Sequence, residues 1–165
     1  MQPEEGKKST AGGSKSGSGE GSAPRILIAD DDLQSVELLE AYLADTGYEV
    51  RTATDGEATL RETQQWQPDV ILLDIMMPKI SGFEVCKRLR ANSSSRSIGI
   101  LMITALDQSS DVERAVEAGT DDFLTKPINK TELLLRIRSL LKSRQNQNNL
   151  DRALAYIEAV ERGEK

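Results

Sequence analysis

Short apolar runs alternate along the chain with longer segments in which apolar residues recur every three or four positions. The short runs are typical of strands buried on both faces of a parallel sheet, and the spaced pattern is typical of helices that cover such a sheet. The predicted strands are 26–29, 49–53, 70–73, 98–103 and 120–124. The segments with helical spacing are 36–43, 58–66, 85–89, 112–116 and 133–141.

These repeats of strand and helix predict one open parallel sheet. Parallel strands need crossover connections, and those connections place helices on both faces of the sheet. Pairs that favour turns, such as Thr46-Gly47 and Ser81-Gly82, lie between the predicted elements. We therefore expect an α/β fold with a doubly wound sheet. Its binding crevice should lie beyond the carboxyl ends of the strands.

Composition divides the chain into three parts. Residues 1–24 contain half of the 12 glycines and no periodic apolar pattern, which predicts a disordered Gly/Ser-rich tail. Residues 25–142 form the predicted folded domain. Residues 143–165 contain a polar run followed by an amphipathic stretch, which predicts a helical extension or linker. This last part is too short to form an effector domain, so we expect none in this sequence.

The amphipathic stretch near the end of the chain allows two interpretations. Leu150, Ala153, Ile157 and Val160 follow a spacing of three, four and three residues. That stripe is too short for a firm coiled-coil assignment, and it does not continue the register of the preceding helix. The extension either packs on its own domain or forms a dimerisation or signalling helix. A homodimer is therefore one predicted state.

Charge and composition exclude several functions. The net charge of −6 argues against nucleic-acid binding by this chain, because phosphate backbones are bound by clustered Lys and Arg. The first apolar run is too short for a signal peptide or a membrane span, so we expect a cytoplasmic protein without membrane contact. The chain has no histidine, which excludes a Ser-His-Asp triad, a His-ligated zinc and a phosphohistidine on this chain. Its one cysteine, Cys86, is predicted to be a reduced core residue.

Polar residues follow the predicted strands at the edge where a crevice is expected. Asp30–Asp32 follow the first strand, Asp74 the third, Thr104 the fourth and Lys126 the fifth. Carboxylates crowded together repel one another, and Mg²⁺ would resolve that conflict while leaving positions open for a phosphate. Lysine and a hydroxyl suit phosphoryl oxygens, and an aspartate can act as the nucleophile that accepts the group. The simpler alternative is that these aspartates only cap the helices that follow.

Several segments together resemble the receiver domain of two-component response regulators. They are ILIADDD, VILLDIMMPKISGFEVCKRLR, ILMITAL and AGTDDFLTKPI, and the resemblance covers about residues 25–142. It implies a flavodoxin-like (βα)5 fold with strand order 2-1-3-4-5. It also implies a phosphoacceptor signalling domain rather than an enzyme with an external substrate. The phosphoryl donor would be a sensor histidine kinase or a phosphotransfer protein, Mg²⁺ would be required, and a conformational switch would signal to a downstream protein effector.

The resemblance assigns the metal and acceptor roles by position. Asp74 would be the phosphoacceptor. Asp31 and Asp74 would ligate Mg²⁺ through their carboxylates, the backbone carbonyl of Met76 would supply a third ligand, and Asp30 would act through bound water. The apolar side chains of Met76 and Leu106 are expected to slow the loss of the phosphoryl group.

The resemblance also assigns the residues of the switch. Thr104 and Lys126 would contact the phosphoryl oxygens, and Phe123 would move inward together with Thr104. A phenylalanine offers no hydroxyl, so its inward state would depend on packing alone. The peptide bond before Pro127 would be cis and would direct Lys126 toward the site.

Two other functions are considered. A receiver-like module that binds proteins without being phosphorylated would have little need for the full set of acids, hydroxyl and lysine. A haloacid-dehalogenase-type phosphatase could use Asp30 and Asp32 as its Asp-x-Asp pair, but Gln34 stands where that pattern needs Thr or Val. It would also leave Asp74 without a role.

Overall fold

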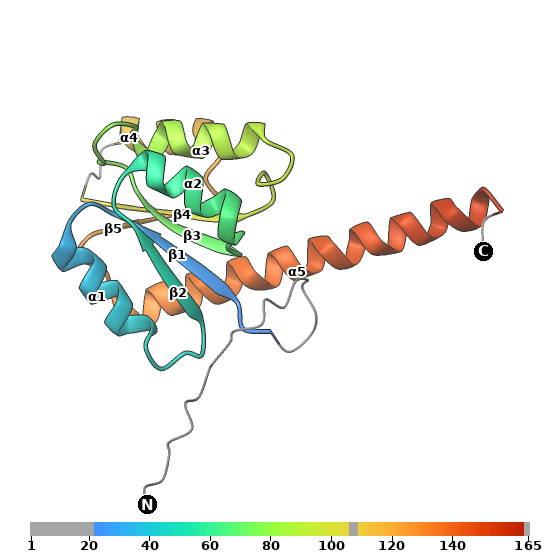
Figure 1. Ribbon diagram of the computed structural model, residues 1–165, viewed down its shortest axis with the longest axis horizontal. Coiled ribbons are helices and arrows are strands. Elements are labelled where there is room, and N and C mark those ends of the chain that lie inside the picture. Colours follow the sequence, from blue (N-terminus) through green and yellow to red (C-terminus); the bar gives the residue numbers. More distant parts are fainter. Residues whose placement is uncertain (1–21, 106–108, 164–165) are drawn as a thin grey trace, which may run out of the picture.

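A computed structural model of the chain describes residues 22–105 and 109–163. The predicted tail therefore lies almost wholly outside the described residues, and so does Leu106. The five strands form one parallel sheet in the order β2-β1-β3-β4-β5. This order and the helices on both faces confirm the predicted doubly wound α/β fold (Figure 1).

Strands and helices alternate along the whole described domain. The strands are β1 (Arg25–Ala29), β2 (Glu49–Ala53), β3 (Val70–Asp74), β4 (Gly99–Thr104) and β5 (Asp122–Thr125). The helices are α1 (Leu33–Leu43), α2 (Gly56–Trp66), α3 (Gly82–Ala91), α4 (Ser109–Ala118) and α5 (Lys130–Glu161). The predicted start of the fifth strand at Thr120 is two residues early. The Thr120 hydroxyl donates to the carbonyls of Ile100 and Asp122, which holds Thr120 in the turn before β5.

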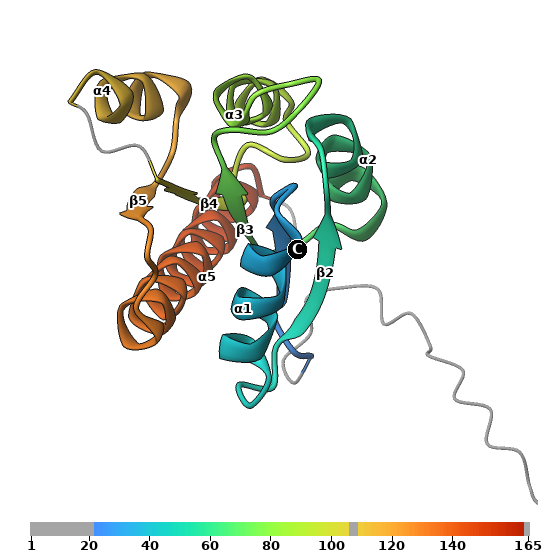
Figure 2. The same ribbon diagram turned by 90° about the vertical axis from the view of Figure 1, so that its left-hand side faces the viewer.

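The central strands separate two hydrophobic layers. Side chains alternate across β1, so that Leu27 and Ala29 join the layer under α2, α3 and α4, whereas Ile26 and Ile28 join the layer under α1 and α5. Figure 2 shows these two sets of helices on opposite faces of the sheet. All residues of β3 and β4 are buried, which explains their continuous apolar sequence. Cys86 lies in the first layer and is fully buried, as predicted.

Helix α5 is much longer than the part of it that packs against the sheet. Asn129 caps its start by accepting from the backbone N–H of Glu132, and Leu133 and Ile137 bury its first turns against the sheet. The helix then continues without a break through the polar run and projects beyond the sheet (Figure 1). The apolar side chains of its last turns are about half exposed or more, so they do not pack on the domain in this structure.

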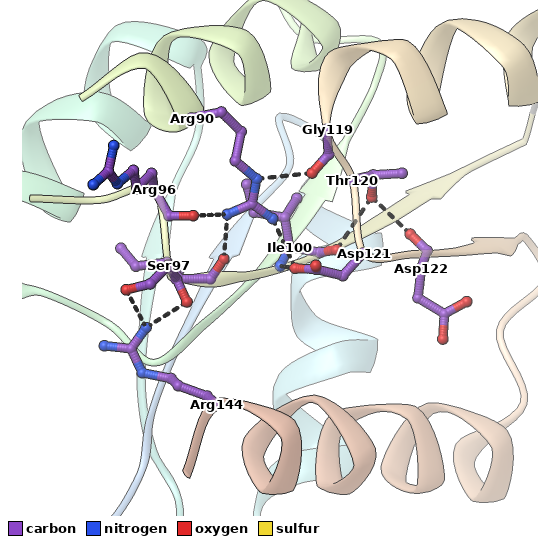
Figure 3. A network of polar contacts seen from close by, with 10 residues as sticks. Arg90, Arg96, Ser97, Ile100, Gly119, Thr120, Asp121, Asp122 and Arg144 are labelled. Atoms are coloured by element: carbon purple, nitrogen blue, oxygen red, sulfur yellow. Dashed lines mark hydrogen bonds and ion pairs between the residues drawn. The ribbon is translucent and has the colours of Figure 1, made fainter. Parts of the chain in front are cut away.

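A polar network closes the amino-terminal edge of the sheet, opposite the strand ends that carry the predicted site (Figure 3). The Arg90 guanidinium donates to the carbonyls of Gly119, Arg96 and Ile98 and pairs with the Asp121 carboxylate at 2.7 Å. The same carboxylate accepts from the backbone N–H of Ile100. The network therefore ties the loop before β4 to the turn before β5 through one side chain.

At the same edge, Arg144 ties α5 to the loop before β4. Its guanidinium donates to the Ser97 carbonyl at 2.8 Å and lies 3.4 Å from the Asp69 carboxylate. Figure 3 shows Arg144 reaching from α5 to Ser97. These contacts anchor α5 to the domain at Arg144.

Candidate functional site

The candidate site lies at the carboxyl ends of the two central strands. Ala29 and Leu73 are paired in the β1–β3 register, so Asp30 and Asp74 follow them side by side at the sheet edge. Both aspartates are nearly inaccessible, with 2% and 6% of their surface exposed, and Asp31 is exposed. One carboxylate oxygen from each of the three lies within 4.8 Å of the others. The structure therefore brings together the three acids that the sequence singled out.

Lys126 reaches this cluster from the loop after β5. Its ammonium lies 3.2 Å from Asp30 Oδ2 and 3.5 Å from Asp74 Oδ2, and it also donates to the Ser35 hydroxyl at 3.1 Å. The Lys126–Pro127 peptide bond is cis. One ammonium thus stands against three carboxylates, which leaves the cluster with an excess of negative charge.

That excess charge appears in the acid–base behaviour of the site. Burial and the neighbouring Asp30 charge raise the pKa of Asp74 to about 6, although the Lys126 ammonium and the Met76 backbone N–H favour its ionised form. Burial alone would lower the pKa of Lys126, but the Asp74 and Asp30 carboxylates outweigh it and the pKa is raised. Lys126 is therefore a cation at neutral pH. At neutral pH Asp74 is mostly ionised, and a further cation would stabilise this ionised form.

The oxygen atoms of the cluster suit Mg²⁺. This ion binds carboxylate, carbonyl and water oxygens at about 2.1 Å, so opposite ligands of its octahedron are about 4.2 Å apart. A separation of no more than 4.8 Å between the acid oxygens is close to that requirement. A dication would also offset the charge that one lysine leaves uncompensated. Asp30, Asp31 and Asp74 are thus able to hold the ion.

Thr104 lies in β4 and Phe123 in the neighbouring edge strand β5. Thr104 is the last residue of β4, is 1% exposed and pairs in register with Thr125, directly before Lys126. Its carbonyl accepts from the backbone N–H of Lys126, which fixes the two residues at the same end of the sheet. Phe123 lies earlier in β5, half-buried against the layer under α2, α3 and α4.

The loop between β3 and α3 packs tightly behind Asp74. A side chain at Gly82 would place its Cβ 2.4 Å from the Asp74 carbonyl oxygen and 2.8 Å from Ile75 Cα, so only glycine fits there. Lys79 adopts a left-handed backbone with φ of 73°, and its ammonium pairs with Asp55 at 3.6 Å and Glu57 at 3.7 Å. These contacts attach the loop to the start of α2.

Two contacts of the site were not predicted from the sequence. Ser35 holds the Lys126 ammonium and also donates to the Asp32 carboxylate at 3.1 Å. Asp32 is the N-cap of α1 and accepts from the Gln34 backbone N–H, which matches the simpler capping alternative for this one aspartate. Ser35 lies three residues after that cap, in the first turn of α1. This place in the first turn of the helix that follows β1 was the sequence signal that Ser35 lies near the strand ends.

Comparison with known proteins gives a consistent result. Residues 26–138 match the family model of the response regulator receiver domain. The chain is 45% identical over 119 residues to the DNA-binding dual master transcriptional regulator RpaA of Synechocystis sp., a match that covers 72% of this chain and 49% of RpaA. It is 47% identical over 118 residues to the response regulator PleD of Caulobacter vibrioides, covering 72% of this chain and 26% of PleD.

Solved structures show the same similarity. The crystal structure of a response regulator candidate from Chloroflexus aurantiacus J-10-fl superposes with a TM-score of 0.71 at 37% identity, covering 73% of this chain and 99% of that one. The chain spans about half of RpaA and a quarter of PleD. Within the described part of the chain, none of the helices is both long and apolar enough to cross a bilayer. From the family match and the fold, the chain belongs to the response regulator receiver domains.

Proposed function

We propose that Asp74 is the phosphoacceptor of this receiver domain. The observation that carries the proposal is the approach of the Lys126 ammonium to a buried carboxylate that already lies beside two others. Asp74 ends a central strand, and its Oδ2 lies 3.5 Å from the ammonium. A phosphoryl group attached there would find a cation within reach of its oxygens.

The transfer itself requires little acid–base chemistry from this chain. An ionised Asp74 oxygen forms a bond to phosphorus while the phosphorus–nitrogen bond of the donor imidazole breaks, and the imidazole takes up the proton it needs as it leaves. The donor is a phosphohistidine of a sensor histidine kinase or a phosphotransfer protein. Since Asp74 has a pKa of about 6, most molecules hold the reactive carboxylate at pH 7 and above.

Asp31, Asp74 and the Met76 carbonyl would hold Mg²⁺ directly, and Asp30 would hold it through water. When bound, the ion would neutralise charge on the phosphoryl oxygens. Lys126 would pair with one of those oxygens. Thr104 would turn its hydroxyl toward another, and Phe123 would move inward as Thr104 moves.

That movement would signal to a downstream protein effector. We assign no turnover of an external substrate, only phosphorylation of the domain and its reversal. The cytoplasmic location predicted from the sequence is part of this proposal and rests on the family. RpaA is described as DNA-binding, but the excess of acid in this chain favours a protein partner for the domain itself.

Intact mass spectrometry tests the proposal. The chain is incubated with phosphoramidate, a small phosphodonor with a phosphorus–nitrogen bond, with and without Mg²⁺, beside the D74N variant. We expect one phosphoryl adduct that requires both Asp74 and the metal. An adduct that survives in D74N would place the acceptor elsewhere, with Asp30 the first candidate. Absence of any adduct would favour the binding module that is not phosphorylated.

A further inference from the structure

The last turns of α5 carry an apolar face that no part of the described domain covers. Five large side chains within eleven residues are 49–70% exposed: Leu150, Leu154, Tyr156, Ile157 and Val160. With Ala153 they occupy an arc of about 160° of the helix at 100° per residue. An arc of that width is typical of a helix packed against another element rather than of a solvated one. The projecting position of the helix leaves this face open (Figure 1).

The order of side chains on this face has an internal symmetry. Its midpoint is the level of Ala155. Leu150 and Val160 lie five residues before and after that level, Ala153 and Ile157 lie two before and after it, and Leu154 and Tyr156 flank it. A two-fold axis perpendicular to the helix at this level would therefore map the apolar face onto itself.

We propose that this face binds the same face of a second copy of the chain, with the two helices antiparallel. In that arrangement Leu150 packs on the partner's Val160, and Ala153 packs on the partner's Ile157. Each layer joins a larger with a smaller side chain, which fills the space between helices evenly. Leu154 meets the partner's Leu154, and Tyr156 meets the partner's Tyr156 across the axis.

A parallel pairing of the same face is poorer. It would place Ala153 opposite the partner's Ala153 and leave a gap in the layer. It would also set Leu154 and Tyr156 beside the partner's polar residues, because in parallel coiled coils the flanking positions of one helix face different positions of the other. The apolar arc would then remain partly exposed.

Charge complementarity favours the antiparallel second copy as the occupant. Lys142 and Arg144 are the charged residues of the segment 142–149, which is basic, although Arg144 already pairs with Asp69 of its own domain. The tip of the described helix carries Glu158, Glu161 and Arg162. It therefore has a net negative charge. Antiparallel pairing brings each basic root toward the partner's acidic tip, whereas parallel pairing aligns like with like. The antiparallel arrangement also places the two helix dipoles in opposite directions, which is favourable.

The polar ends of the face also meet one another. Glu161 lies in the same arc as the apolar residues, and in the antiparallel pair it faces the partner's Gln147, whose amide can donate to a carboxylate. The partner's Gly163 would reach the level of Gln147, just beyond Arg144, where α5 leaves the domain. The pairing therefore fits within the projecting part of the helix.

Sedimentation equilibrium of the full chain over a range of concentrations tests for the dimer. The contact would bury less surface than the roughly 1,200 Å² at the lower end of standard interfaces. We therefore expect a dissociation constant on the order of 100 µM. I157E should weaken dimerisation about tenfold or more, because it places a carboxylate in a central layer. A155E is the matched control, since Ala155 is exposed on the opposite face and its variant should dimerise like the wild type.

Distances between spin labels test the orientation. A label at Gln145→Cys should report about 30 Å between copies in the antiparallel pair and roughly 20 Å or less in a parallel one. The native cysteine does not interfere, because Cys86 is buried and burial raises the pKa of its thiol to about 11. The expected result is a dimer, lost in I157E, kept in A155E, with the longer distance.

Four outcomes would overturn the proposal. A monomer at every concentration means that another protein covers the face. A dimer that persists in I157E places the interface elsewhere on the domain, and loss of the dimer in A155E as well removes the assignment to this face. A short distance between the labels makes the pair parallel. None of these outcomes depends on phosphorylation of Asp74, so the proposed function is tested separately.

Discussion

The Lys126 ammonium lies 3.5 Å from the Asp74 carboxylate, although 52 residues separate the two in the chain. Lys126 is also 3.2 Å from Asp30, and its side chain is only 24% exposed. Removing one partner of a mostly buried ion pair leaves the other charge uncompensated. The two central aspartates therefore depend on this lysine whenever no metal is bound.

K126M should destabilise the metal-free fold at pH 8 by about 1–3 kcal/mol, because Asp30 and Asp74 lose their cation. Added Mg²⁺ should restore much of this loss, since a dication supplies the missing positive charge. Urea denaturation with and without Mg²⁺ measures both effects. K79M is the matched control. Its ion pairs with Asp55 and Glu57 are exposed at the lysine, and it should cost less than about 1 kcal/mol with no dependence on the metal.

D74N should stabilise the metal-free protein above pH 7. The folded-state pKa of Asp74, about 6, is above its ordinary value of 3.8, so the folded state binds this proton more tightly than the unfolded state. The corresponding stabilisation is present below pH 3.8 and is lost as the pH rises through 6. The neutral amide does not suffer this loss, and the gain at pH 8 should be about 1–3 kcal/mol.

The pH profile distinguishes this cause from a packing effect. Denaturation of wild type and D74N from pH 4 to pH 8 should show the two curves meeting near pH 4 and separating through the window from 4 to 6. A constant difference across that range would contradict a raised pKa for Asp74. Mg²⁺ should stabilise the wild type more than D74N, because the amide is the weaker ligand.

Much of this site could be predicted because it depends on where strands end. A buried parallel strand is a continuous apolar run, so Asp30 and Asp74 could be placed at strand ends from the sequence alone. The order of the strands could not be derived from periodicity, since every buried strand has the same pattern. It came from the family resemblance.

Other features depend on contacts between distant segments. Ser35 meets Lys126 only because α1 packs next to the loop after β5, and 91 residues separate the two. The unbroken course of α5 through Ser143–Asn149 could not be derived from apolar spacing, because that run has no apolar residue. Its Arg and Gln residues nevertheless have good helix propensity, and no glycine or proline interrupts the run.

G82A should destabilise the domain by about 2–3 kcal/mol, because the new Cβ overlaps the backbone of Asp74 and Ile75. It should also slow phosphorylation, since any relief of the overlap displaces Asp74. G47A separates crowding from backbone preference. Gly47 has φ of 86° but no atom within 4 Å of an added Cβ, so its variant should cost only about 1 kcal/mol and leave phosphorylation unchanged. Equal losses in the two variants would contradict the role of crowding.

R90A should destabilise the domain by about 2–4 kcal/mol. It leaves the carbonyls of Gly119 and Ile98 without a donor and removes the partner of Asp121 at the amino-terminal sheet edge (Figure 3). R90K should recover little, because an ammonium cannot reach several carbonyls and a carboxylate in the same fork. R88A is the control on the same helix. Arg88 makes an exposed pair with Glu84, worth about 0.5 kcal/mol. Thermal denaturation of the three variants would rank them.

The proposed switch can be followed at Phe123, because the chain has two phenylalanines and a fluorinated sample gives two ¹⁹F resonances. An F83L sample assigns them. Phosphorylation should shift the Phe123 resonance in the wild type by moving the ring inward. T104V keeps the shape of Thr104 without its hydroxyl, so it should still accept a phosphoryl group while the Phe123 resonance stays near its original position. If that resonance shifted fully in T104V, the movement of Phe123 would not depend on the Thr104 hydroxyl.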